Sequence, residues 1–320
     1  MSTKQELQSQ SLALLNNRAS TALRLLQEHD FPCIEAPKDS ITISCRSKNS
    51  AWNIPFEHPP LKTKEQDDIV RWEWTEAEEI RIDLLMPLDN ISCDVAVWFA
   101  ATQGSHFQDR HVHQLLSASL LGLEVDWSHI TEKGLQNICK ISTLALLDLS
   151  WTRLPTSSLT ELRKLERLKC VKLNAHRITP ELISILNMLP IEQLHLNQCR
   201  VQALSQLALP SLKEIWLWDS NITDADLRFV EHCPNLERIE MRGCGIQGFR
   251  MQSLRSASKL RILNLSSTPL SSNALSSLHD LPSLLYLNIS HTAVEKRAVE
   301  MFKENRAGFN LPPIKIQETK

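Results

Sequence analysis

Apolar residues recur along the last two thirds of the chain in the frame LxxLxLxxxxL. The frame returns at intervals of 24, 24, 23, 21, 24, 24 and 24 residues, and a fixed period of this length indicates a repeat protein. Its eight starts are Leu120, Leu144, Leu168, Ile191, Leu212, Leu236, Leu260 and Leu284.

Each repeat combines two hydrophobic periods. The central LxL pair alternates as in a short strand, so its two apolar side chains share one face. The second half is apolar at helical spacing, as at Leu135 and Ile138, which places both side chains on one face of a helix. Thr131, Thr179 and Thr223 stand where N-caps are expected. We therefore predict one strand and one helix per repeat, with stacking that buries the apolar faces of neighbours.

Two irregularities qualify this pattern. The fourth repeat, from Ile191, is three residues shorter than the 24-residue repeats, so we predict that its second half is not a full helix. The segment Leu311–Ile316 fits the frame as a truncated ninth strand. Together with a predicted helix near Glu295–Arg306, it would supply the polar cap that a terminal repeat needs.

The pattern resembles the leucine-rich repeats (LRRs) of bacterial type, LxxLxLxxTxITDxxLxxLxxLPxL, over Leu120–Ile316. The resemblance implies an α/β solenoid with a curved parallel sheet inside the arc and helices outside. It also implies that the ninth residue of each repeat bonds backbone groups in the turn and is structural. These residues are Ser128, Thr152, His176, Cys199, Ser220, Cys244, Thr268 and Thr292.

The N-terminal part is built differently, since only 11 of the 51 leucines lie in residues 1–110. We predict a small α+β module of unknown role at 1–92 and a degenerate capping repeat or linker at 93–119. An LRR solenoid of eight repeats plus a C-terminal cap follows at 120–320.

Within this part, an apolar stripe at residues 7–26 predicts a helix. Alternating apolar residues at 41–45, 70–74 and 80–84 predict short antiparallel strands. Val95–Ala101 is predicted to form another strand, in the position of a degenerate first repeat.

The sequence offers little for catalysis. The seven glycines argue against phosphate-binding loops, and GxSxG, P-loop, HExxH and CxxC motifs are absent. The frame turns Cys199 into the turn core, which disfavours a Cys–His nucleophile with His195. A metal site formed by Cys93, His106, His111 and His113 has no standard zinc spacing. We predict no enzymatic activity, no cofactor and no metal.

Charge argues against a nucleic-acid partner. The net charge is −2, divided as −6 over residues 1–119 and +4 over 120–320, which is far from a strongly basic footprint. Seven acids crowd Glu65–Glu79; they predict a solvated surface, or alternatively a docking patch for a basic partner.

The N-terminal MSTKQELQSQ has no hydrophobic signal-peptide core, and the longest apolar stretch is far shorter than a membrane helix. We therefore expect a cytoplasmic protein with no membrane partner and with reduced cysteines.

The residues between the leucines carry the functional information. Trp216 and Trp218, flanked by His195, Arg238 and Arg242, form the best candidate binding site on the concave sheet, because Trp and Arg dominate interface energetics. The alternative is that these tryptophans pack across neighbouring strands and seal the sheet.

An acidic end of the same face contains Glu124 and Asp148. Trp127 and Trp151 occupy one position in adjacent repeats, which favours a structural stack.

These observations predict a non-enzymatic interaction scaffold that binds a protein partner on its concave sheet. In the alternative, the N-terminal module carries the activity of an adaptor or effector, and the repeats select its target. A weaker third option is an inhibitor that acts by occlusion.

Overall fold

The computed structural model describes residues 108–110, 112, 116 and 120–318, with the backbone of four strands nearer the N-terminus. The chain divides into two compact units, Met1–Arg167 and Leu168–Lys320. The predicted helix at 7–26 and the cysteine and histidines considered for a metal lie outside the described residues. The predicted domain boundaries stay predictions.

The described strands of the N-terminal part form two sheets. β2 (Val70–Trp74) and β3 (Ile80–Leu84) pair antiparallel, as predicted. The antiparallel prediction was wrong for β1 (Ile41–Thr42), which pairs parallel with β4 (Val97–Ala100). β4 pairs in turn, parallel, with β5 (Leu120–Glu124). The long connection between β1 and β4 leaves room for the crossover that parallel pairing requires.

The first two full repeats complete this unit. They consist of β5, α3 (Glu132–Ile138), β6 (Leu146–Asp148) and the 3₁₀ helix η2 (Thr156–Lys164). β5 and β6 are parallel and in the register that the frame requires, with Leu123 opposite Leu147.

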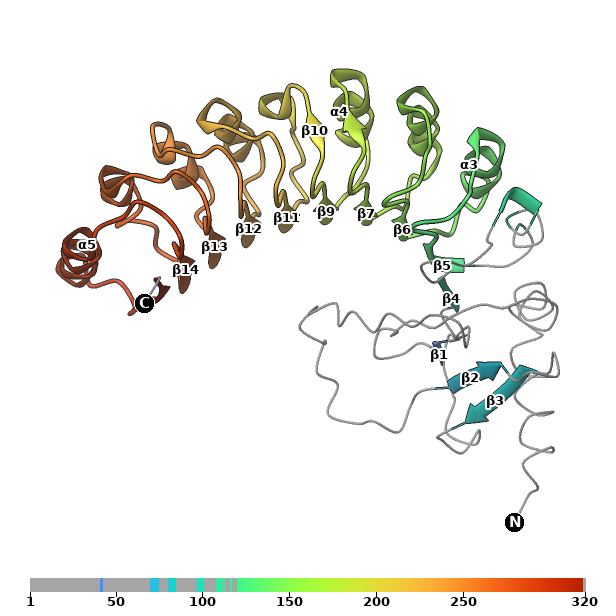
Figure 1. Ribbon diagram of the computed structural model, residues 1–320, viewed down its shortest axis with the longest axis horizontal. Helices are drawn as coiled ribbons and strands as arrows, with labels where there is room; N and C mark the ends of the chain where they lie inside the picture. Colours follow the sequence, from blue (N-terminus) through green and yellow to red (C-terminus); the bar gives the residue numbers. More distant parts are fainter. Residues whose placement is uncertain are drawn as a thin grey trace, which may run out of the picture. The chain divides into compact units, whose positions relative to one another are not determined.

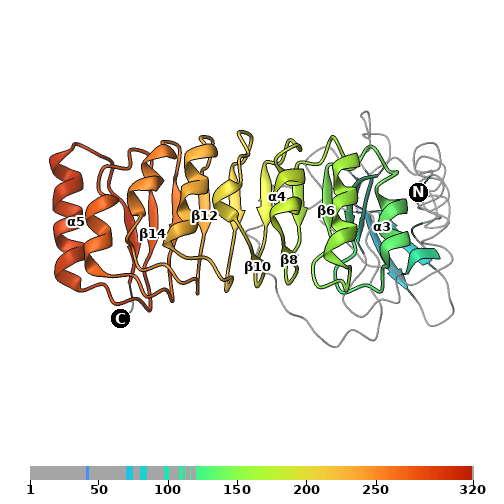
Figure 2. The ribbon, with the colours of Figure 1, turned by 90° about the horizontal axis from the view of Figure 1, so that it is seen from above.

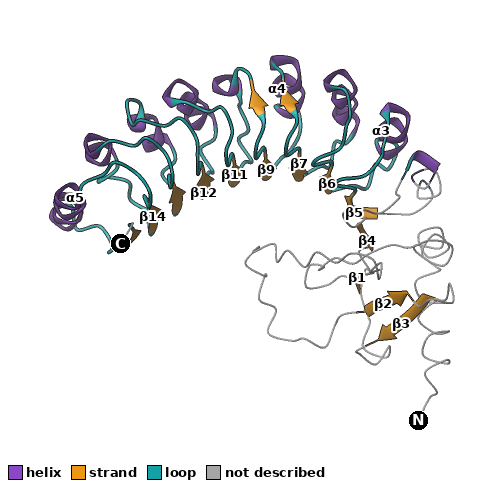
Figure 3. Ribbon diagram, viewed as in Figure 1, coloured by secondary structure: helices purple, strands orange, loops and turns teal. Residues whose placement is uncertain are grey.

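In the second unit, parallel strands follow one another in chain order, each one repeat after the last. They are β7 (Cys170–Lys172), β9 (Gln193–His195), β11 (Glu214–Trp216), β12 (Arg238–Glu240), β13 (Ile262–Asn264), β14 (Tyr286–Asn288) and β15 (Lys315–Gln317). Within this unit the strands line the inner side of an arc and the helical segments lie outside (Figures 1 and 3). From above, the helical segments lie side by side (Figure 2). β15 is the predicted ninth strand.

The outer segments of this unit are helical, as predicted, but most are 3₁₀ rather than α. They are α4 (Pro180–Leu186), η3 (Leu204–Gln206), η4 (Asp224–His232), η5 (Met251–Ser256), η6 (Ser272–Ser277) and α5 (Lys296–Gly308). In the 3₁₀ segments the backbone makes i→i+3 hydrogen bonds; the Asp226 amide, for example, donates to the Thr223 carbonyl at 3.0 Å. The short fourth repeat has only the three residues of η3, as predicted.

Two predicted caps begin these segments. Thr179 accepts a hydrogen bond from the Leu182 amide and precedes Pro180, the first residue of α4. Thr223 and Asp226 form a capping box at the start of η4. Both arrangements satisfy amides that the first turn of a helix leaves without partners.

The core consists of the frame positions themselves. The fourth residue of each repeat, from Leu123 on β5 to Leu287 on β14, is fully buried, and the helical positions represented by Leu135 and Ile138 are at most 2% exposed. Each such side chain stabilises the fold by about 1.5–3 kcal/mol. Since one repeat buries its apolar face only against the next, the core is a row of stacked layers.

The turn after each strand has a fixed backbone. The eighth residue of every repeat has a positive φ: Trp127, Trp151, Ala175, Gln198, Asp219, Gly243, Ser267 and His291. The ninth residue follows in the turn. Most of these side chains bond backbone groups, as the resemblance implies, whereas the buried Oγ of Ser128 has no hydrogen-bond partner among the described residues. Thr152 donates to the Leu149 carbonyl at 2.7 Å, whereas Cys199 donates to the Leu173 carbonyl of the preceding repeat at 3.1 Å.

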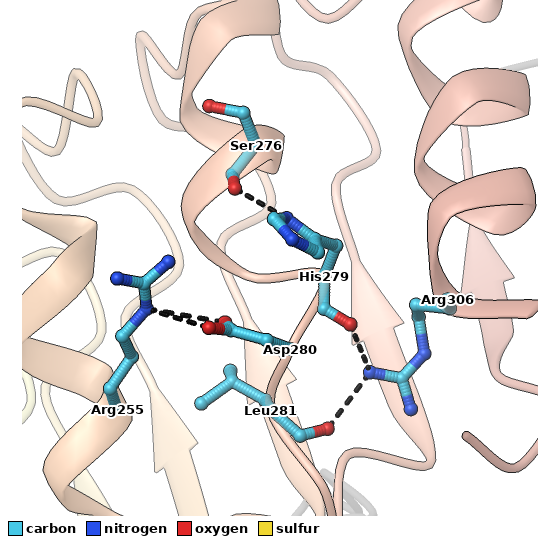
Figure 4. Close-up of polar contacts among 6 residues, drawn as sticks. All are labelled: Arg255, Ser276, His279, Asp280, Leu281 and Arg306. Atoms are coloured by element: carbon cyan, nitrogen blue, oxygen red, sulfur yellow. Dashed lines mark hydrogen bonds and ion pairs between the residues drawn. The ribbon is translucent and has the colours of Figure 1, made fainter. Parts of the chain in front are cut away.

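At the C-terminal end, α5 is anchored by Arg306, which is 2% exposed. Its Nη1 donates to the carbonyls of Leu281 at 2.8 Å and His279 at 3.3 Å (Figure 4), and its Nη2 donates to that of Leu284 at 3.1 Å. The neighbouring Arg255–Asp280 ion pair joins η5 to the segment after η6 (Figure 4). A buried cation therefore ties the last helix to the backbone of the repeat before it.

Candidate functional site

Short parallel strands determine which residues the inner face of the second unit presents. In each three-residue strand the central side chain enters the core, so the two flanking side chains lie on the opposite face. We define the concave surface as these flanking residues of β9, β11 and β12, together with Trp218 and Arg242, two residues beyond β11 and β12. Parallel register places Trp216 beside His195 on one side and beside Glu240 on the other.

His195 and Trp216 form a stacked pair across β9 and β11. Their ring centroids are 3.9 Å apart and the rings are inclined by 13°. His195 is buried, whereas Trp216 is half-buried. The stack fixes one face of the indole against the sheet, so Trp216 packs across strands and still presents surface to solvent.

Trp218 is held in place by polar contacts. Its backbone amide donates to Asn197 Oδ1 at 2.8 Å, and its indole Nε1 lies 3.4 Å from Glu240 Oε2. The side chain remains half-buried. Fixed aromatic groups of this kind lose little conformational entropy when a partner docks.

Glu240 is the centre of the polar contacts on the concave surface. It is buried and accepts a hydrogen bond from Asn264 Nδ2 at 2.8 Å in addition to the contact with Trp218. Arg238 Nε lies 3.4 Å from Glu240 Oε1, and its Nη1 lies 4.0 Å from Glu214 Oε2. Burial raises the pKa of Glu214, and the charge of Arg238 opposes that shift.

The two arginines have unused donors. Arg238 makes the two loose ion pairs above, and its buried Nε has no hydrogen-bond partner among the described residues. Arg242 is exposed, and within residues 120–318 no hydrogen bond or ion pair engages its guanidinium.

Five of the seven predicted site residues therefore lie together on β9, β11 and β12 or just beyond them. Glu214, Glu240 and Asn264 were not among the predicted site residues, although they occupy the same flanking positions of adjacent strands. The regular register of the frame is the signal that points to them.

The other two predicted residues, Glu124 and Asp148, lie opposite each other on β5 and β6 in the first unit. Asp148 is buried, and its Oδ1 accepts a hydrogen bond from the Ser150 amide at 2.9 Å. This contact gives Asp148 a role in the turn. In the same unit, Trp127 and Trp151 stack with centroids 4.8 Å apart, as predicted.

Cys199 is unsuited to nucleophilic chemistry. Its side chain is buried, and burial raises the pKa of the thiol to about 12. At neutral pH it is therefore a thiol rather than the nucleophilic thiolate.

In the described part of the chain, no group of three or more His, Cys, Asp or Glu residues is arranged to hold a metal ion. No described helix combines the length and apolar character needed to cross a bilayer.

No protein-family profile and no curated protein matches the chain. Solved structures with a similar fold include internalin C2 of Listeria monocytogenes, at 20% identity, 62% coverage of this chain, 78% coverage of its own and a TM-score of 0.45. A second internalin of that organism, inlF, has 16% identity, coverages of 75% and 79%, and a TM-score of 0.43.

A complex of TLR13 with ssRNA13 also matches, at 18% identity, 62% coverage of this chain and a TM-score of 0.47. The match spans only 32% of the TLR13 chain. The fold assignment rests on this chain's own strand register and buried columns. Residues 120–318 have the α/β architecture of leucine-rich-repeat proteins.

Proposed function

We propose that the chain is a non-enzymatic interaction scaffold and that its concave surface binds a protein partner. The observation that carries this proposal is the grouping of two half-buried tryptophans with two arginines whose donors are unused. Such residues supply most of the binding energy of protein interfaces. Residues of neighbouring strands already hold the tryptophan side chains in place, so little side-chain entropy is lost when a partner binds.

The test compares affinity capture from native extract by the full chain and by two double variants. We expect Trp216→Ala with Trp218→Ala to lose a specific partner by about tenfold. The control is Met188→Ala with Phe249→Ala, since these side chains are 75% and 74% exposed and lie on the helical side, after α4 and before η5. The control should retain the partner.

Thermal unfolding of both double variants accompanies the capture, so that loss of folding is distinguished from loss of binding. A folded tryptophan variant that recovers the same partner in the same amount would defeat the site assignment. Equal losses of the partner from both double variants would indicate nonspecific adsorption rather than a binding site.

The alternative of an adaptor or effector with an active N-terminal module concerns residues outside the described part, and it stays a prediction. The expectations of a cytoplasmic location and of no nucleic-acid partner also stay predictions.

A further inference from the structure

We infer that the partner presents acidic side chains to Arg238 and Arg242. This inference rests on the proposed function and specifies the chemistry of the partner. It starts from the polar groups of the concave surface that already have protein partners and those that do not.

The acceptors on this surface are already engaged. Glu240 accepts from Asn264 and Trp218 and faces Arg238. Glu214 faces the same arginine and accepts a side-chain hydrogen bond from Gln193. Neither carboxylate requires a cation from a partner.

The donors are in excess. A guanidinium carries five N–H groups, yet Arg238 makes only ion pairs at 3.4 and 4.0 Å. Its Nε is buried and faces Glu240, but 24% of the side chain is exposed, so a ligand would contact the Nη groups. Arg242, in the same repeat, contributes a second, exposed guanidinium. A ligand that complements this surface must therefore bring acceptors, and carboxylates accept from guanidinium groups in bidentate geometry.

Two carboxylates flank Arg238. Glu240 comes from its own strand and Glu214 from the strand beside it, and the ion pairs at 3.4 and 4.0 Å are loose enough to leave the guanidinium available to an acceptor of the partner.

The charge of the concave surface favours separate carboxylates over a nucleic-acid backbone as the ligand. Three carboxylates, those of Glu214, Glu240 and the exposed Asp219, lie among the two arginines and the tryptophans, so this surface has no excess of positive charge. A continuous row of phosphates would meet these acids, whereas nucleic-acid sites are strongly basic. Separate acidic side chains on a polypeptide can instead contact the arginines and place apolar neighbours on Trp216 and Trp218.

The experiment measures binding of fluorescent polymers to the full chain by anisotropy, at about 0.15 M salt, where long-range attraction is screened. The probe is a glutamate–tyrosine copolymer. A lysine–tyrosine copolymer and polyuridylate RNA serve as comparisons. Three proteins are tested: the unmodified chain, Arg238→Gln with Arg242→Gln, and Arg228→Gln with Arg250→Gln.

The last variant is a matched control. It removes the same two charges, but from exposed residues of η4 and of the turn before η5, on the helical side. We expect the unmodified chain and this control to bind the acidic copolymer equally. The Arg238/Arg242 variant should bind it about tenfold more weakly or worse.

Preference for polyuridylate or for the lysine copolymer, no binding of the acidic copolymer, or equal weakening by both arginine pairs would overturn the inference. The proposed function would survive those results if the tryptophan pair were still required for partner capture. If the tryptophan pair proved dispensable while the arginine dependence held, the proposed site would need revision and the acidic preference would stand.

Discussion

At the scale of single residues, burial and pairing give two carboxylates opposite behaviour. Burial raises the pKa of Glu214 on the concave surface. Hydrogen bonds from Lys169 and Lys213 lower that of Glu192. Although both glutamates belong to one ladder of strands, one opposes folding when ionised and the other supports it.

Glu214→Gln should therefore stabilise the chain at neutral pH. Because its folded pKa lies above the ordinary value, this carboxyl loses folding stability as the pH rises from about 4.5 through the folded pKa. The advantage of the variant should grow over that window and vanish well below it, as measured by urea unfolding at several pH values.

Glu192→Gln provides the control of opposite sign. Its lowered pKa contributes stability above about 4.5 that is lost as the pH falls through the folded pKa. This variant should be less stable than the unmodified chain at neutral pH and should approach it in acid. The same sign for both variants across the window would contradict the assigned environments.

At the scale of elements, two glycines have opposite requirements. Gly248, before η5, has a φ of +107°, and a Cβ there would lie 2.3 Å from Ala274 Cβ. Gly308 ends α5, and a Cβ there would meet nothing within 4 Å. One position needs glycine and the other only tolerates it.

We expect Gly248→Ala to destabilise the chain by about 2 kcal/mol or more, since strain and overlap act together. Gly308→Ala should stabilise it by about 0.5–1 kcal/mol through helix propensity. Denaturant unfolding of the two variants measures both changes. Similar effects at the two sites would contradict the described turn.

Much of the secondary structure could be predicted from the sequence. The frame predicts the main-sheet strands from β5 to β15 and the residues of the core, because each repeat can bury its apolar face only against the next. It does not predict β8 (Arg177–Ile178) and β10 (Arg200–Val201), which pair with each other in a separate parallel sheet. The frame does not distinguish 3₁₀ from α helices either, since α3 and η4 both belong to 24-residue repeats. The parallel pairing of β1 was missed because alternation alone carries no strand direction.

The candidate site was predictable only in part. Arg238 and Trp216 follow from their frame positions, but the sharing of Glu240 among Trp218, Asn264 and Arg238 depends on side-chain rotamers across three strands. Frame position likewise does not reveal that Asp148 is buried and accepts a hydrogen bond from the Ser150 amide.

At the scale of the whole molecule, the terminal repeats have a large effect on stability. Each terminal repeat has only one neighbour, and the stability of a repeat array is a sum of contacts between neighbouring repeats. Arg306→Met would remove the donors of several buried carbonyls around Leu281 and Leu284. Unsatisfied buried acceptors cost about 1–3 kcal/mol each. Hydrogen exchange should therefore quicken first in β14, α5 and β15.

Arg297→Met serves as the control, because Arg297 is exposed on the same helix. It should leave exchange in β14 and β15 unchanged. Uniform acceleration across residues 168–317 in the Arg306 variant would contradict a local capping role.

Photo-cross-linking in native extract tests most directly whether the partner lies on the concave surface. A photoreactive phenylalanine derivative replaces Trp218 in one protein and Phe249 in another, so that an aromatic group is exchanged for an aromatic group. We expect a discrete cross-linked protein from position 218 and none from position 249. The same product in equal yield from both positions, or a product from position 249 alone, would contradict the claim.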